Sequence, residues 1–298
     1  MNLRVSLLLL SVLYGLACPP MTLAASTPAA VTVEAVQMPA WIEHDGGKKT
    51  PVYAGMQLRN RDQLRTGATS RVLLRTSDGS SVKLGENATF RLDDLPQRPI
   101  ANVFTASMHV LEGAFRFTTD TLSRFHAKRD VRIVFPTVTT GVRGTDLWGK
   151  SAPERQVVCL IEGNIEVMPQ GEASIVMDKP LQFYVREKGQ SQPVAAVDPN
   201  QLKEWAVETE ITPGKGSARR GGRWKLILAT ANSQAEALEL YDAIRDAGYP
   251  AEILPGVAEG DRRVYALRLT QLPSRAEAES LAAELKGRFG ITAPRISM

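Results

Sequence analysis

The chain has 298 residues, of which 43% are hydrophobic and 23% are charged. These fractions are close to globular averages and exclude a disordered or collagen-like chain, and the length allows one large domain or two ordinary ones. The formal net charge is only +4. This modest value argues against a dedicated nucleic-acid binder, because such proteins carry a concentrated basic face.

The first 25 residues predict an exported protein. Residues 5–17 are almost unbroken apolar sequence, which suits a signal peptide and is short for a membrane-spanning helix. Small residues follow, so we expect cleavage after Ala24 or Ala25 and a mature chain in the periplasm. A lipoprotein anchored through Cys18 is the less favoured alternative. No later run reaches the length of a transmembrane span.

Residues 26–44 are expected to be an exposed lead-in, and residues 45–190 to form an all-β domain. Short β-branched runs in the second segment are separated by Gly, Asp, Asn and Pro at regular intervals. Asp78-Gly79 between two such runs is a strong hairpin signal, and residues 162–164 predict a second hairpin. The pattern favours a hairpin-rich sandwich or a solenoid-like roll.

Residues 191–221 are expected to be a linker. Residues 202–207 fit one short helix, and residues 212–222 are rich in Gly, Ser and basic side chains, which is typical of a flexible hinge.

Residues 222–298 contain an internal repeat. The strand-like residues 224–228 recur as residues 265–269, and each copy is followed by a capping box that begins at Ser233 or Ser274. The helices that follow each have one apolar face. The predicted order is βαββαβ, a ferredoxin-like α+β unit with two helices on one face of a four-stranded sheet.

Motifs for catalysis or metal binding are lacking. The three histidines, His44, His109 and His126, stand in separate segments, and there is no phosphate-binding glycine loop or nucleophile elbow. Asp93-Asp94 is interpreted as a turn, and Cys159, inside an apolar run, as a buried thiol. We therefore predict a non-enzyme without cofactor or metal.

Several distinct short motifs occur along residues 50–170. In chain order they are Arg61-Asp62, Thr66-Gly67, Asp78-Gly79-Ser80, Phe135-Pro136-Thr137, and the run Gly141, Val142, Arg143, Gly144 and Thr145. Together they resemble the FecR domain family, whose pattern usually has Gly-Asp at the first motif and Thr-Pro at the fourth. The Gly-Val-Arg-Gly-Thr run is the specific part of this resemblance.

The FecR resemblance implies a periplasmic β module that binds or senses another envelope component. FecR itself regulates a sigma factor through a cytoplasmic segment and a transmembrane helix. The sequence shows neither, so that role is not expected here. Arg143 stands between two glycines and has two interpretations: a clamp for an anionic or peptide ligand, or a structural Arg bonded to loop carbonyls.

Residues 222–298 resemble the SPOR domain through residues 224–231 and 265–275. This family is a βαββαβ module that binds peptidoglycan glycan strands stripped of their stem peptides. Polar residues of the family pattern are replaced in this chain: Ile227 stands at the position of the first-strand Gln, and Ala266 at the position of an Arg. The two positions at which the family has Phe also carry non-aromatic residues here.

Strand alternation predicts which side chains face away from the helices. The candidate glycan-binding residues on that outer face are Lys225, Ile227, Arg268, Thr270 and Gln271. Ile227 between small neighbours also suggests a face covered by protein, with the chain's own β domain as one candidate.

Two functions follow from these patterns. The first is an exported envelope protein whose SPOR-like module docks on peptidoglycan glycan, with a role at division sites, and whose FecR-like module binds another envelope component. The second is a periplasmic interaction scaffold whose SPOR-like sheet face binds an unidentified envelope protein rather than glycan.

Overall fold

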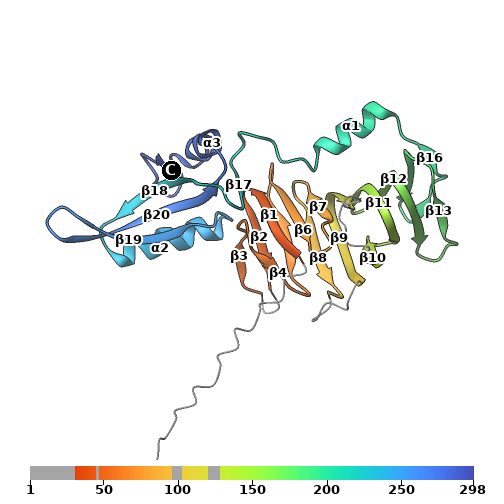
Figure 1. The fold of residues 1–298 in the computed structure, drawn as a ribbon, viewed down its shortest axis with the longest axis horizontal. Coiled ribbons are helices and arrows are strands. Elements are labelled where there is room, and N and C mark those ends of the chain that lie inside the picture. Colours follow the sequence, from red (N-terminus) through yellow and green to blue (C-terminus); the bar gives the residue numbers. More distant parts are fainter. Residues whose placement is uncertain (1–30, 45–46, 96–102, 120–127) are drawn as a thin grey trace, which may run out of the picture.

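The computed structural model describes residues 31–44, 47–95, 103–119 and 128–298. Within these ranges it contains a 17-stranded sheet, a four-stranded sheet and three helices (Figure 1). The predicted signal peptide, Cys18 and His126 lie outside the described residues. None of the helices in the described ranges combines the length and hydropathy needed to cross a membrane.

The larger sheet contains every strand up to β17. The first eight strands are β1 (Val31–Gln37), β2 (Ala40–Glu43), β3 (Lys49–Pro51), β4 (Gln57–Leu58), β5 (Gln63–Thr66), β6 (Arg71–Thr76), β7 (Ser81–Leu84) and β8 (Thr89–Asp93). The next eight are β9 (Val103–Thr118), β10 (Lys128–Val134), β11 (Val138–Ala152), β12 (Arg155–Pro169), β13 (Ile175–Met177), β14 (Gln182–Glu187), β15 (Gln190–Ser191) and β16 (Ala195–Ala196). Helix α1 (Pro199–Val207) and strand β17 (Ser217–Arg219) complete this part.

The exposed lead-in predicted for residues 26–44 is wrong for the part that the structure describes. Strand β1 begins at Val31, and Val31, Val33 and Val36 are fully buried. The apolar residues alternate with polar ones there, which is the pattern of a half-buried strand. The prediction used the overall composition of the segment and did not consider this alternation.

The strands of the larger sheet form two rows. One row runs through β1, β6 and β7 to the second halves of β9 and β11, the first half of β12, and β14. The other runs through β3, β2, β5 and β8 to the first half of β9, β10, the first half of β11, the second half of β12, and β13. Side chains from both rows belong to one buried apolar cluster.

The three longest strands pass from one row to the other. Each bends at a glycine with positive φ: Gly113 (88°), Gly144 (65°) and Gly163 (98°). The chain packs closely there, because a Cβ on Gly163 would lie 2.4 Å from the carbonyl oxygen of Gly144. The hairpin predicted at residues 162–164 is therefore wrong, since β12 continues through a bend. The hairpin predicted at Asp78-Gly79 is confirmed between β6 and β7.

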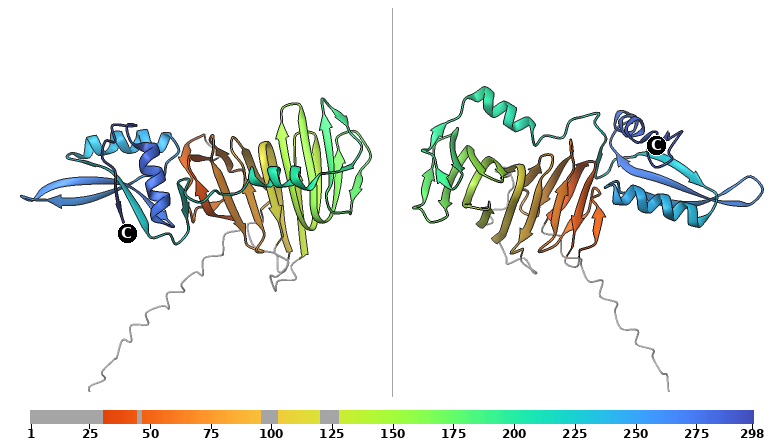
Figure 2. Two further views of the ribbon diagram at one scale, coloured as in Figure 1. Left: turned by 90° about the horizontal axis from the view of Figure 1, so that it is seen from above. Right: turned by 180° about the vertical axis from the view of Figure 1, so that it is seen from behind.

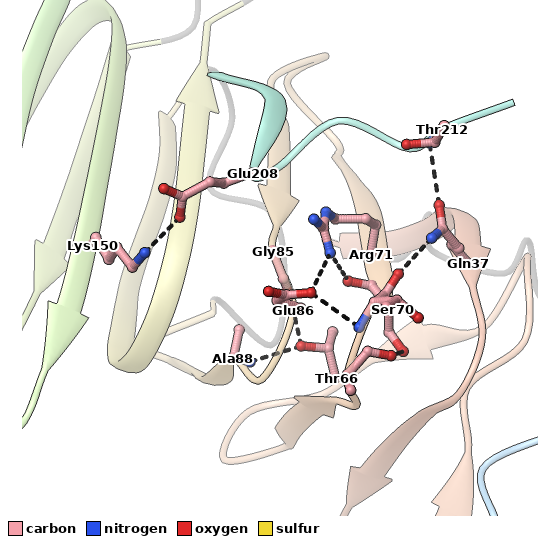
Figure 3. Close-up of polar contacts among 12 residues, drawn as sticks. Gln37, Thr66, Ser70, Arg71, Gly85, Glu86, Ala88, Lys150, Glu208 and Thr212 are labelled. Carbon is pink, nitrogen blue, oxygen red and sulfur yellow. Dashed lines mark hydrogen bonds and ion pairs between the residues drawn. The ribbon is translucent and has the colours of Figure 1, made fainter. Parts of the chain in front are cut away.

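Residues 199–219, called the strap below, run across the outer side of the first row (Figures 1 and 2). On α1, the ring of Trp205 stacks on Trp148 with 4.8 Å between centroids and 8° between planes. Glu208 then pairs with Lys150 at 2.7 Å, and the backbone N–H of Thr212 donates to the Gln37 side chain at 3.2 Å (Figure 3).

The strap ends as part of the sheet. Strand β17 pairs with β1, and its Ser217 and Ala218 are buried. The flexible linker predicted for residues 191–221 is therefore wrong. The Gly- and Ser-rich composition is real, but contacts with residues far away in the sequence hold the segment in place.

The smaller sheet consists of β18 (Trp224–Ala231), β19 (Glu252–Ala258), β20 (Arg262–Leu272) and β21 (Arg295–Ser297), in the spatial order β19–β20–β18–β21. Helix α2 (Gln234–Asp246) follows β18, and α3 (Arg275–Leu285) follows β20. This order of elements is the one that the repeat predicts. Ser233 and Ser274 cap the two helices through their side-chain oxygens, as the capping boxes predict.

The smaller sheet and its helices contact the larger sheet at the strap and beside β2. On α3, the buried Glu277 accepts hydrogen bonds from the backbone N–H groups of Gly214 and Ser217, both at 2.8 Å. Beyond α2, Gly248 packs against the Trp41 ring, and the Trp41 indole donates to the carbonyl of Asp246 at 2.9 Å. The strap and β2 thus fix the position of the smaller sheet.

Candidate functional site

Four of the five predicted glycan-binding residues share one face of the smaller sheet. Lys225 and Ile227 lie on β18, and Arg268 and Thr270 lie on the neighbouring β20. Ile227 is the direct cross-strand partner of Arg268. All four are partly exposed, whereas the leucines between them are buried, so the alternation predicted from the sequence holds.

Gln271 is separated from this group. Its backbone is left-handed, with φ 61°, next to an irregularity in the pairing of β18 with β20. Its side-chain oxygen is buried without a hydrogen-bond partner. That oxygen cannot meet a ligand on the open face, so the structure does not support Gln271 as a polar contact there.

Glu252 is a residue of this face that the sequence interpretation missed. It lies on β19, directly opposite Arg268. Its carboxylate accepts hydrogen bonds from Arg268 Nε and from the Thr270 hydroxyl, both at 3.2 Å. The sequence contained one signal for it: Glu252 directly precedes an apolar strand residue, Ile253. Successive side chains of a strand point to opposite faces, so Glu252 is expected on the outer face. Of the two cationic side chains of the face, Arg268 is therefore already paired with an acid.

An apolar strip runs beside these polar groups. Ile227, Ala266 and Leu254 are all partly exposed, and Leu254, opposite Ala266 across the β19–β20 pair, is 47% exposed. The larger sheet contacts the smaller one through the strap and through residues beyond α2. In the described ranges, the face carrying Leu254 remains open. The prediction that the chain's own β domain covers this face is therefore not supported.

The Gly-Val-Arg-Gly-Thr motif lies on β11, where that strand changes rows. Gly144 forms the bend, and the backbone N–H of Thr145 donates to the Thr119 hydroxyl at 2.6 Å. The next residue, Asp146, binds Arg116 through two hydrogen bonds of 2.9 and 2.7 Å. The described part of the motif thus shapes the fold. The side chain of Arg143 lies outside the described residues, so both of its interpretations remain.

The Arg116–Asp146 pair extends to the strap. A guanidinium nitrogen of Arg116 lies 3.5 Å from Glu210, which also pairs with Lys83 at 2.5 Å. Hydrogen bonding to Asp146 raises the pKa of Arg116. The FecR-like motif and the strap are therefore part of one charged cluster.

Two histidine–carboxylate pairs lie on the outer side of the second row. His44 Nδ1 is 2.6 Å from buried Asp62, and His109 Nε2 is 3.1 Å from Asp93, which also binds Arg91. Burial, together with the Arg91 charge, lowers the pKa of His109 below its ordinary value of 6.5. Asp93, predicted as part of a turn, instead ends β8 as half of an ion pair.

This shift has a pH consequence that can be measured. Because the folded state disfavours protonated His109, its contribution to stability is complete above the unfolded pKa of 6.5 and is lost as the pH falls through the lower folded pKa. We expect the thermal midpoint of the wild type to fall on acidification below about pH 6.5. The His109→Gln variant should fall less. Parallel curves for the two proteins would contradict this assignment.

The sequence predicted neither a metal site nor a reactive thiol. The described residues contain no group of three His, Cys, Asp or Glu side chains suited to a metal ion. Cys159 is buried, and burial raises the pKa of its thiol to about 12, so the reactive thiolate is not populated near neutral pH.

Comparison with known proteins agrees with the two-part architecture. The model of the FecR protein family matches residues 62–166, and the SPOR domain model matches residues 221–293. Domains of the first kind act in signalling and those of the second bind peptidoglycan. Both kinds are non-catalytic modules.

Two solved structures also show similarity. Both are crystal structures of a protein of Parabacteroides distasonis ATCC 8503 that is provisionally named an anti-sigma factor, with 17% and 15% sequence identity and a TM-score of 0.39. The matches cover 74% of this chain and 89% and 91% of the crystal chains. No curated protein matches the chain. From the two domain matches, the chain contains a FecR domain followed by a SPOR domain.

Proposed function

We propose that the protein is an exported cell-envelope binding protein whose SPOR domain docks on peptidoglycan glycan strands. Its FecR domain would bind or sense another envelope component. The observation that carries this proposal is the open sheet face, where Arg268 and Thr270 lie beside an exposed apolar strip. Sugars present hydroxyl groups and flat apolar faces, and this surface offers partners for both.

The domain limits enter as part of the proposal. The FecR unit would extend from β1 to residue 190, and the SPOR unit would span residues 222–298 as a ferredoxin-like module. The strand order β19–β20–β18–β21 and the position of the helices support that interpretation. Export through a cleaved signal peptide, with the mature chain in the periplasm, fits domains that act in the envelope.

A protein-binding scaffold is the second candidate. Ile227 stands where the family has Gln, and Leu254 adds a large exposed apolar side chain to the same face. Glu252 also neutralises Arg268. An apolar face on which Arg268 is already paired is suited to a protein surface, because docking there leaves that charge with its partner.

Co-sedimentation with peptidoglycan sacculi tests the two candidates. The chain from residue 26 onward is mixed with intact sacculi and with sacculi stripped of stem peptides by an amidase. We expect retention on the stripped form. Arg268→Ala should weaken it about tenfold, because a charged hydrogen-bond donor to the ligand is lost. Ile227→Gln should strengthen it by adding a polar contact.

The control is Arg275→Ala. Arg275 lies at the start of α3 and pairs with Glu279 on the helix surface. It should leave retention unchanged. Absence of retention on both kinds of sacculi would contradict glycan binding, and loss of a protein partner on Ile227→Gln substitution would favour the scaffold.

A further inference from the structure

One edge of the SPOR sheet is incompletely paired. Strand β21 pairs with β18 only at Lys225, Leu226 and Ile227. Residues 228–230 continue β18 beyond that point, and on this side they have no partner strand among the described residues. An unpaired strand edge presents N–H and C=O groups that can bind another extended chain.

The segment that leads into β21 turns away from this edge. Gly287, Phe289 and Gly290 all have positive φ, with Phe289 at 52°. The loop is closed by its own hydrogen bonds: Gly287 N–H donates to the carbonyl of Ile291, and Ile291 N–H donates to that of Arg288, both at 2.8 Å. A bulky residue in the left-handed region is unusual and costs energy. Phe289 and Gly290 line the space beside residues 228–230.

A groove of about 530 Å³ lies between the loop, helix α2 and the open edge of β18. Its apolar lining includes Leu228, Ala229, Leu240 and Phe289. Two acids of α2, Glu236 and Glu239, and one cation of β21, Arg295, also line it, and all three are exposed. In the described part of the chain, Glu239 has no ionic partner.

The opposite edge of the sheet is protected in a way that this one is not. Strand β19 carries Pro255, which has no N–H to donate to an added strand. The open stretch of β18 has an irregularity in its pairing with β20 between Ile227 and Ala229, and beyond it carries the small residues Ala229 and Thr230, without a proline or a charge. Small side chains leave the backbone accessible, so this edge can accept a strand.

We propose that this groove binds an extended segment of a protein partner as an added strand alongside residues 228–230, in line with β21. Apolar side chains of the segment would contact Leu240 and Phe289, and a Lys or Arg would face Glu236 and Glu239. The partner is a polypeptide, because alternating backbone N–H and C=O groups match a strand edge and sugar hydroxyls do not. This site adjoins the outer face on which the proposed function depends, and Ile227 belongs to both.

Short peptides of stated sequence test the proposal on the chain from residue 26 onward. The probe is the fluorescein-labelled hexapeptide Val-Thr-Lys-Thr-Val-Thr, in which Val and Lys share one face of an extended strand, and fluorescence anisotropy measures its affinity. A version N-methylated at alternate residues cannot complete the strand hydrogen bonds, and we expect it to bind at least about tenfold more weakly. Amide hydrogen exchange should slow at residues 228–230 when the unmodified peptide is bound.

Reversing the charge of a groove residue tests whether the peptide binds in the groove. Glu239→Lys should weaken binding of this peptide about fivefold and strengthen binding of its counterpart with Glu in place of Lys. Asp242→Lys is the matched control, because Asp242 lies exposed on the same helix outside the groove. It should change both affinities by less than about twofold.

Three results would overturn the proposal. They are failure of the unmethylated peptides to bind, equal effects of the two charge reversals, and protection from exchange confined to other strands. Protection of residues 228–230 by glycan fragments of peptidoglycan, with none by peptide, would assign the groove to sugar instead. Arg268 does not line the groove and Glu239 does not lie on the outer face, so the effect of Arg268→Ala on retention and that of Glu239→Lys on peptide binding distinguish failure of either proposal from failure of the other.

Discussion

Replacing Gly163 with Ala is expected to lower the free energy of unfolding by about 3–5 kcal/mol. Gly163 has a φ of 98°, a region that costs an L-residue energy. In addition, its new Cβ would lie 2.4 Å from the Gly144 carbonyl oxygen and 3.0 Å from the Thr145 Cα. These are backbone atoms, so the bend of β12 itself would have to shift. Chemical denaturation of wild type and variant measures the loss.

The matched control is Gly171→Ala. Gly171 also has positive φ, 77°, but nothing lies within 4 Å of the Cβ position. We expect a loss of only about 1 kcal/mol, the backbone term without the collision. Equal losses at the two sites would show that the passage of β11 and β12 from one row to the other does not depend on close approach of their backbones.

The two glycines of the FecR motif should differ for the same reason. Gly144 has positive φ and open space at its Cβ position, whereas Gly141 has open space and no positive φ. Gly144→Ala should cost about 1 kcal/mol and Gly141→Ala less than about 0.5 kcal/mol. A severe loss at Gly141 would contradict this structural account of the motif.

Replacing Glu277 with Ala is expected to release the strap from the SPOR domain. Glu277 is only 4% exposed, and its two oxygens accept the N–H groups of Gly214 and Ser217. Without the carboxylate these donors lose their partners, which costs about 3 kcal/mol locally. Cleavage by trypsin after Lys215 and Arg219 should therefore accelerate about 100-fold, since about 1.4 kcal/mol corresponds to a factor of ten.

Glu279→Ala is the control for this experiment. Glu279 lies on the same helix, exposed, in an i,i+4 pair with Arg275. Such surface pairs contribute little, so its cleavage rate should stay within about threefold of wild type. Small-angle scattering of the Glu277→Ala variant should also show a wider range of domain separations. Unchanged cleavage and scattering would mean that β17 and the contacts of the strap with the larger sheet hold the strap without Glu277.

Local sequence patterns were sufficient for several elements. Asp78-Gly79 predicted the β6–β7 hairpin, since few other residues suit a tight turn of positive φ. The two capping boxes and the recurring strand pattern predicted the order of elements in residues 222–298. The apolar run around Cys159 predicted a buried thiol. Each of these features depends on residues close together in the chain.

The remaining features depend on contacts across the fold. Gly163 looks like a hairpin turn in sequence, but the neighbouring backbone of Gly144 makes it the bend of a continuous strand. The candidate site shows the same limit: alternation placed Arg268 and Ile227 on one face, yet the pairing with Glu252 required the position of β19.

The sequence by itself determined two modules and which side chains of the SPOR strands face outward, because turn chemistry and strand alternation act over a few residues. The tertiary structure decided how the modules are joined. Residues 212–222 have the composition of a free hinge, and it is the distant Glu277, Lys150 and Gln37 that hold the strap. Partners separated by 58 to 175 positions in the chain leave no periodic signal, so only folding brings them together.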